Sequence, residues 1–126
     1  MSIPNNLKYT KEHEWVLVEG NIGTIGVTDY AQGELGDVVF VDIDPSLSNI
    51  KKGDSVGTIE AVKTVSDIFA PFSGKVIEIN EALKDNPESV NSDPYGSGWM
   101  LKVEISDSTE LNDLLDAPSY QALIGQ

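Results

Sequence analysis

The chain has no cysteine, no arginine and only one histidine, His13, among its 126 residues. Without cysteine it has no disulfide, no thiol nucleophile and no cysteine-ligated metal site, so redox or acyl-transfer chemistry has to come from an attached group. His13 lies at the start of an expected strand, with no visible serine or cysteine partner for a catalytic pair. We therefore expect a structural role for His13, no catalytic residue and no metal site.

Positive charge is also scarce. Eight lysines face 21 acidic residues, which gives a formal net charge of −13. This balance repels nucleic acids and anionic lipids and favours partners with basic docking surfaces, although solubility alone explains the same composition equally well. The glycines form no phosphate-binding pattern followed by a helix, so we expect no nucleotide site.

Long apolar runs and targeting patterns are missing as well. No run approaches 18 apolar residues, and residues 1–6 resemble neither a signal peptide nor a transit peptide. We therefore expect a cytoplasmic bacterial protein that does not enter a membrane. A length of 126 residues favours one domain, residues 1–126, with a β core at about 8–105 and a helical tail at about 107–124.

Alternation of apolar residues predicts a mainly β fold. The expected strands cover residues 15–19, 22–27, 38–43, 75–79 and 99–105. Thr28 and Gly36 would cap one short helix, and Pro118 would begin a final helix in the tail, after a capping box at residues 107–110. A short echo between residues 23–43 and 74–105 predicts two similar β layers. Three aromatic residues are expected in the core: Trp15, Phe40 and Trp99.

Lys63 lies at the tip of a hairpin expected between residues 55–61 and 64–70. The tip, residues 61–64, lacks the Gly, Asn or Asp that tight hairpins usually use. Most lysines at such a tip are simply polar surface residues. The unusual turn instead indicates display: a flexible amine on a rigid β frame suits amide ligation to a carboxylate-bearing cofactor.

The residues around Lys63 resemble a known family. Residues 60–67, Glu-Ala-Val-Lys-Thr-Val-Ser-Asp, followed by Ala-Pro-Phe-Ser-Gly-Lys-Val at 70–76, resemble the lipoyl-lysine hairpin of the glycine cleavage system H proteins. Further blocks resemble this family in order and with about the same spacing: His13-Glu14-Trp15 and residues 25–32, 35–41, 90–95 and 98–100. A lone modified-lysine pattern is weak, whereas this ordered set covers nearly the whole chain.

This resemblance implies a barrel-sandwich hybrid of two antiparallel sheets with a lipoyl-lysine hairpin, short helices and a C-terminal helix. It also implies lipoate in amide linkage to Lys63 and a carrier that is not an enzyme. In the family, a pyridoxal-phosphate glycine decarboxylase leaves the aminomethyl group on the lipoyl arm. A tetrahydrofolate-dependent aminomethyltransferase removes it, and a dihydrolipoamide dehydrogenase reoxidises the dithiol. A lipoate ligase or a lipoyl or octanoyl transferase would attach the cofactor, and we expect a monomer.

The resemblance also suggests residues around the arm. Glu14 and Asp67 are candidates to line a cleft that holds the cationic amine, although both could equally be solvated strand carboxylates. Glu60, Ser66 and Asp67 are candidates for recognition by the ligating enzyme, or they only keep an exposed edge soluble. The chain departs from the family at two positions, with Glu12 where a small hydroxyl residue is common and Glu34 where a histidine is common.

Four other functions are compatible with parts of this pattern. A biotin carrier typically has methionines beside its lysine, and the lipoyl domain of a 2-oxo acid dehydrogenase typically has Asp-Lys and an Ala/Pro-rich linker; the chain has neither. A lipoate relay, which donates the cofactor to other acceptors, remains open. So does an unmodified acidic β scaffold that binds a partner.

Overall fold

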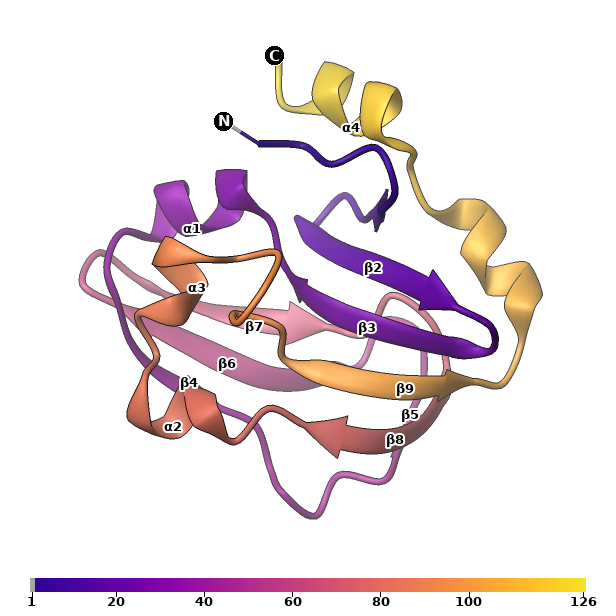
Figure 1. Ribbon diagram of the computed structural model, residues 1–126, viewed down its shortest axis with the longest axis horizontal. Coiled ribbons are helices and arrows are strands. Elements are labelled where there is room, and N and C mark those ends of the chain that lie inside the picture. The colour runs from indigo at the N-terminus through magenta and orange to yellow at the C-terminus, as the bar shows by residue number, and fades with distance from the viewer. Residues whose placement is uncertain (1) are drawn as a thin grey trace.

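The computed structural model describes residues 2–126, which form two antiparallel sheets and a few short helices (Figure 1). The larger sheet has the order β1-β2-β3-β9-β8-β5 and the smaller has the order β4-β6-β7. The strands are β1 Lys8–Tyr9, β2 Glu14–Glu19, β3 Ile22–Val27, β4 Val38–Asp42, β5 Asn49–Ile50, β6 Ser55–Ala61, β7 Val65–Phe69, β8 Gly74–Ile79 and β9 Leu101–Ile105. The predicted fold class, mainly β with two antiparallel sheets, is confirmed.

Short helices connect and cover the strands. They are α1 Asp29–Leu35, α2 Ala82–Asp85, α3 Ser89–Ser92, the 3₁₀ helix η1 Ser108–Asp113 and α4 Ala117–Leu123. The predicted caps of α1 are present: the Thr28 side chain accepts from the Ala31 N–H at 3.2 Å, and Gly36 follows the helix at φ 82°. The final helix begins within one residue of the predicted proline, with Asp116 as its N-cap.

The main hydrophobic core lies between the two sheets, because side chains of both contribute to it, such as Ile25 and Val103 from the larger sheet and Ile59 and Ile68 from the smaller. A second cluster contains Leu7, Tyr9, Trp15, Ala117 and Tyr120. There the N-terminal segment and α4 lie side by side over β2 (Figure 1). Trp15 covers Gly26 so closely that a Cβ at position 26 would lie 2.6 Å from its ring, which explains this glycine inside a strand.

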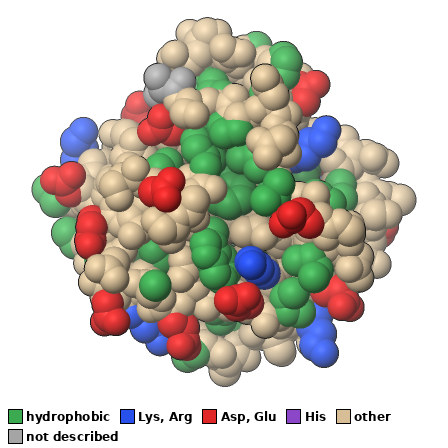
Figure 2. Space-filling view, in the orientation of Figure 1, with side chains coloured by type: hydrophobic (Ala, Val, Ile, Leu, Met, Phe, Trp, Pro, Cys, Tyr) green, Lys and Arg blue, Asp and Glu red, His purple; other side chains and the backbone are tan. Residues whose placement is uncertain are grey.

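The prediction of two similar layers is wrong. The repeated segments at β3 and β8 are both in the larger sheet, where β9 lies between them, and β4 is in the smaller one. The echo therefore reflects a shared strand pattern and not a shared layer. Figure 2 shows the face with β2, β3 and β9, where acidic side chains are widely spread and hydrophobic ones gather over β2.

Phe40 is not a core residue: 42% of it is exposed, whereas Trp15 is buried and Trp99 is half-buried. The cause is a bulge in β4. Val38 pairs with Ala61 and Phe40 pairs with Glu60, so Val39 has no partner in the register. Val39 and Phe40 both become exposed, whereas strict alternation would bury one of them. A similar register shift in β8 leaves Ile77 47% exposed.

The predicted capping box at residues 107–110 is only half right. Asp107 does cap η1, accepting from the Thr109 N–H at 3.0 Å. Glu110, which was expected to reach back to the cap, instead accepts from the Ser73 N–H at 2.7 Å and from its hydroxyl at 3.0 Å. Glu110 thereby attaches the tail to the start of β8.

No helix in residues 2–126 combines the length and the hydrophobicity that a bilayer crossing requires.

Candidate functional site

Lys63 lies at the tip of the β6–β7 hairpin, which projects from one end of the molecule (Figure 1). Glu60 pairs with Val65, and the Ala61 N–H donates to the Thr64 carbonyl at 2.9 Å, so the tip turns within two residues, Val62 and Lys63. Neither has a positive φ, because the described residues with that geometry are His13, Gly20, Gly36, Gly53 and Gly125. The backbone therefore explains why the tip contains no Gly, Asn or Asp, and its composition alone does not indicate attachment.

Neighbouring segments hold the hairpin tip in place. The Val62 N–H donates to the Asp37 carbonyl at 3.0 Å. Asn91, on α3, in turn fixes the segment that contains Asp37: its side chain donates to the Gly36 carbonyl at 3.0 Å and to Gln32 Oε1 at 3.0 Å, and accepts from the Val38 N–H at 2.8 Å. A flexible side chain is thus displayed from a rigid support.

The Lys63 side chain is exposed, but its aliphatic stem follows the backbone of Gly36. A Cβ at Gly36 would lie 3.3 to 3.4 Å from Cγ, Cδ and Cε of Lys63. No ion pair within residues 2–126 includes the Lys63 ammonium. The amine is therefore accessible, and its stem points along the end of α1.

A small cavity of about 120 Å³ lies beside α1 and the open edge of β7. Its apolar wall contains Val27, Ala31, Leu35 and Ile59, and its polar wall contains Glu12, His13, Glu14, Glu34, Ser66 and Asp67. The structure thus brings together Glu14 and Asp67, the two predicted cleft residues, with Ser66 and with the two positions at which the chain departs from the family pattern. Glu60 is not in this group. Asp67 is exposed and lines the cavity only from the edge of β7, because the strand pairing places its side chain on the outer surface of the smaller sheet, where Oδ1 accepts from the Ser55 hydroxyl at 3.2 Å.

Glu14 is the most unusual of these carboxylates because it is only 2% exposed. Oε1 accepts from the Thr10 hydroxyl at 2.6 Å, and Oε2 accepts from the Phe69 N–H of edge strand β7 at 3.3 Å. Burial raises the pKa of Glu14 to about 7, although the hydrogen bonds from Thr10 and Phe69 oppose that rise. Near neutral pH this group can therefore be a neutral acid or an anion, and a nearby cation would favour the anion.

A larger cavity of about 440 Å³ lies on the other side of Glu14, between the start of β2 and the tail. Its lining includes Lys11, Lys52 and Pro71, and Lys52 forms an ion pair with Asp113 across it. Glu14 lines both cavities, so its carboxylate lies between them.

The structure supports the structural role expected for His13. Its Nδ1 is 2.9 Å from the Tyr120 hydroxyl, which is also 2.7 Å from the Thr28 hydroxyl at the N-cap of α1. Tyr120 stacks on Tyr9 with ring centroids 4.6 Å apart. Burial lowers the pKa of His13, against the opposing effect of Glu12 and Glu34. This cluster connects α4 to both walls of the small cavity.

Three residues that position the site were missed from the sequence: Thr10, Asn91 and Tyr120. Each acts through one hydrogen-bonding group on a segment without clear periodicity. Asn91 does lie in one of the blocks that resemble the family, which was the only available signal. Within the described residues, no three His, Asp or Glu side chains form a group that could hold a metal ion.

A small β domain that displays one lysine on a supported hairpin beside a cleft has the architecture of a cofactor carrier. Residues 7–126 match the family model described as "Glycine cleavage H-protein". The chain is 57% identical to the glycine cleavage system H protein of Staphylococcus haemolyticus, over 126 residues and 100% of both chains. It is also similar to the crystal structure of a glycine cleavage system H protein from Mycobacterium marinum, with a TM-score of 0.89, 37% identity and coverage of 98% of this chain and 100% of that one.

The chain therefore belongs to the glycine cleavage H-protein family, as the resemblance indicated. Its members are lipoyl carriers of the glycine cleavage system, which act with the other components of that system and are not enzymes themselves.

The residues near Lys63 fit a lipoyl group. The amine is accessible for an amide bond, and the small cavity offers an apolar wall to a hydrocarbon chain and a dithiolane ring. Its opposite wall offers the carboxylates of Glu12, Glu14 and Glu34 to a cation. The absence of cysteine also means that no protein thiol competes with a dithiol.

Proposed function

We propose that this protein carries lipoate in amide linkage on Lys63 and shuttles the aminomethyl group of glycine between enzymes. The pyridoxal-phosphate glycine decarboxylase would load it, and the tetrahydrofolate-dependent aminomethyltransferase would unload it. Dihydrolipoamide dehydrogenase would then reoxidise the dithiol of the arm. The observation that carries the proposal is the accessible Lys63 on a supported hairpin, close to a cavity that contains the buried carboxylate of Glu14.

When bound, lipoate supplies a disulfide that accepts the aminomethyl cargo and becomes a dithiol after the cargo leaves. The protein supplies display and protection. The hairpin holds the attachment point at a fixed place, so that docking of a partner makes each transfer effectively intramolecular. The apolar wall at Ala31 and Leu35 would exclude water from the end of the arm.

Glu14 would hold the cationic amine of the cargo between partners, and Asp67, at the β7 edge of the cavity, remains our candidate to assist it. Glu14 is hydrogen-bonded by Thr10 and Phe69, so its carboxylate is fixed in orientation. A cation beside it favours its ionised form and lowers its pKa from about 7, which makes a charge-assisted contact in a place with little water. Glu12 and Glu34 add negative charge to the same cavity.

Attachment of lipoate requires recognition of the hairpin by a lipoate ligase or by a lipoyl or octanoyl transferase. Glu60, Ser66 and Asp67 remain our candidates for that recognition. Ser66 and Asp67 follow Lys63 on β7, and Glu60 precedes it on β6, so all three lie within four residues of the lysine. We further propose a cytoplasmic monomer in which residues 1–126 form one carrier domain; a single exposed hairpin that several enzymes visit in turn supports the monomer.

Reconstitution tests this proposal. The lipoylated chain, mixed with the three partner enzymes, glycine, tetrahydrofolate and NAD⁺, should support glycine cleavage, and it should show no turnover without them. Lys63→Arg should abolish turnover with all partners present, because it keeps the charge but cannot take the amide. Full activity of Lys63→Arg, or turnover by the lipoylated chain alone, would overturn the proposal.

A further inference from the structure

Four large apolar side chains are exposed in the immediate neighbourhood of Lys63. They are Val39 at 55%, Phe40 at 42%, Val62 at 72% and Val65 at 62% exposure. Only three other large hydrophobic residues in the described chain are exposed to a similar degree, and they are scattered: Val18, Ile77 and Leu123. A cluster of this kind on an otherwise polar surface indicates an interaction site.

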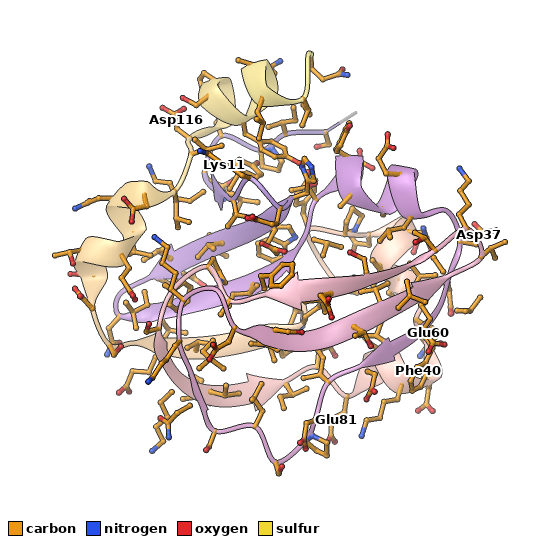
Figure 3. The ribbon with its side chains drawn as sticks, turned by 180° about the vertical axis from the view of Figure 1, so that it is seen from behind. Lys11, Asp37, Phe40, Glu60, Glu81 and Asp116 are labelled. Atoms are coloured by element: carbon orange, nitrogen blue, oxygen red, sulfur yellow. The ribbon has the colours of Figure 1, made fainter. Side chains whose placement is uncertain are left out.

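The strand register places two of these residues, Phe40 and Val65, on one surface with Glu60 between them. Phe40 pairs with Glu60, and Glu60 pairs with Val65, so the three side chains form one row across β4, β6 and β7. Ile59 and Ile68, which alternate with this row, are buried between the sheets, so the row points away from the core. Figure 3 shows Phe40 and Glu60 together at one end of this sheet, with Asp37 beyond them.

The β4 bulge creates this apolar row. Because Val39 is the extra residue, both Val39 and Phe40 are exposed next to Glu60. Regular pairing would have left one apolar residue in the outer row and turned the other into the core. We call the surface formed by Val39, Phe40, Glu60, Val62 and Val65 the hairpin face.

The charge of this sheet is one-sided. The strands β4, β6 and β7 contain Asp42, Glu60 and Asp67 and no lysine. Asp42, Thr58 and Asp67 form the next row on the same outer surface as Phe40, Glu60 and Val65. The surface thus has the Glu60 carboxylate between Phe40 and Val65 and two further carboxylates in the adjacent row, which complements a surface of apolar side chains interspersed with Lys and Arg.

We propose that the hairpin face is the docking surface of the enzyme that attaches lipoate to Lys63, and that this enzyme presents an apolar, basic surface to it. The proposal rests on the function proposed above for Lys63. The attaching enzyme has to bring its acyl carbon to bonding distance of Nζ, so it has to cover the residues that flank the lysine. The enzymes of the glycine cycle need only the far end of the finished arm and can dock elsewhere.

The ligation reaction also requires the enzyme to cover the residues that flank Lys63. The deprotonated Nζ attacks the carbonyl carbon of a lipoyl adenylate made from lipoate and ATP. The C–N bond forms, the C–O bond to phosphate breaks, AMP leaves with the electron pair, and the proton from nitrogen passes to solvent. Nothing in this step is oxidised or reduced. Nζ has to enter the active site of the enzyme, which brings Val62 and Val65 against its rim.

The test measures kcat/KM for lipoylation of the full-length apo chain by its lipoate ligase, with lipoate and ATP, by intact mass. Phe40→Thr and Val65→Thr remove the apolar contacts but place a β-branched residue, which favours strands, at each position, so the sheet is preserved. We expect each to lower kcat/KM about tenfold or more, mainly through KM, as for residues at the centre of an interface. Ile77→Thr is the control, because Ile77 is equally exposed at a register shift in the other sheet.

Salt dependence tests the basic character of the partner. Raising ionic strength should raise KM for the wild-type chain, and Glu60→Gln should weaken that dependence. Circular dichroism and thermal unfolding of each variant confirm that it is folded before its rate is measured.

A second measurement tests whether the hairpin face is specific for the attaching enzyme. The variants are lipoylated to completion with excess ligase and then assayed in the reconstituted glycine cleavage reaction, where we expect wild-type rates. Unchanged lipoylation of Phe40→Thr and Val65→Thr, or an equal loss with Ile77→Thr, would overturn the proposal. So would a loss of glycine cleavage as large as the loss of lipoylation, because the surface would then serve every partner. If wild-type Lys63 accepts no lipoate at all, the proposed function fails instead.

Discussion

Glu14 is the residue on which the cleft depends most. Its carboxylate has two hydrogen-bond donors but almost no contact with solvent. The same burial that raises its pKa to about 7 makes ionisation in the empty cleft unfavourable. A cationic cargo would compensate this cost, so the carboxylate is suited to a ligand that comes and goes.

Replacement of Glu14 by Gln should make the protein less sensitive to pH. The pKa of Glu14 is higher in the native state than its ordinary value of 4.5, so between these two pH values the native state binds more protons than the unfolded state. Stability therefore falls as pH rises through this range, and it is highest below pH 4.5 for this group. We therefore expect the free energy of unfolding of Glu14→Gln, measured relative to that of wild type, to increase by up to about 3 kcal/mol as the pH rises from 4.5 to 8.

Urea unfolding of both proteins across this pH range measures the difference. Glu19→Gln, an exposed carboxylate on the same strand, controls for the loss of one negative charge. A difference between Glu14→Gln and wild type that stays constant with pH would contradict the buried, titrating carboxylate described here.

The sequence indicated Glu14 and Asp67 only through the resemblance, because neither is distinguished by periodicity. Thr10 could not be found in this way, since its role depends on a hydrogen bond between two segments that meet only in the folded chain. For Phe40 the sequence did give a prediction, but the prediction was wrong. Alternation predicted burial, and one extra residue in β4 reversed the prediction.

At the scale of elements, α1 and its two ends form one wall of the cleft. Gly36 ends the helix at φ 82° and ψ −163°, a region that only glycine adopts without strain. Gly33 lies inside the helix with open space around it. The two glycines therefore differ in what an added methyl group would do.

Gly36→Ala should destabilise the protein by about 2 kcal/mol, through backbone strain and through contact with the stem of Lys63. Gly33→Ala should instead stabilise it by about 0.5 to 1 kcal/mol, because alanine is the better helix former. Thermal or urea unfolding of the pair measures both effects. If Gly36→Ala is as stable as wild type, the strained backbone conformation assigned to position 36 is incorrect.

The tail helix α4 also determines the geometry of this wall. Tyr120→Phe keeps the stacking on Tyr9 but removes the hydroxyl that contacts both Thr28 and His13. We expect a loss of about 1 to 2 kcal/mol in the free energy of unfolding, because the buried Thr28 hydroxyl and the part-buried His13 ring both lose a partner. Hydrogen exchange should quicken at the α1 amides, including Ala31, whose N–H the Thr28 hydroxyl accepts.

Tyr30→Phe is the matched control, because the Tyr30 ring also lies against His13, with centroids 4.9 Å apart, but its hydroxyl is not part of the hydrogen bonds that join Tyr120 to Thr28 and His13. Equal exchange at α1 in Tyr120→Phe and wild type would show that α4 does not support the cleft. The sequence predicted this helix almost to the residue. The link through Tyr120 needed the structure, because positions 28 and 120 are far apart in the chain.

At the scale of the whole molecule, the sequence was most informative where local rules decide structure. The positions of the longer strands, the caps of α1 and the hairpin around Lys63 all follow from neighbouring residues, and they were predicted correctly. The assignment of strands to sheets was not, because β9 lies between β3 and β8 through contacts distant in sequence. Bulges, and hydrogen bonds between segments far apart in the sequence, are non-local in the same sense.

The net charge of −13 also belongs to this scale. This charge attracts every partner that has a basic surface. The apolar residues of the hairpin face would allow the chain to distinguish between such partners. A carrier needs both properties, since each enzyme has to find it quickly and release it after one step.

Peptide mass spectrometry of protein from a lipoate-replete native source tests the central claim most directly. Trypsin cleaves after lysine, and a lipoylated Lys63 should resist it, so we predict a peptide of residues 53–75 that carries one lipoyl group on Lys63. Lys63→Arg should lose the group and restore cleavage at position 63. An unmodified Lys63 from that source, or lipoate on a different lysine, would contradict the account.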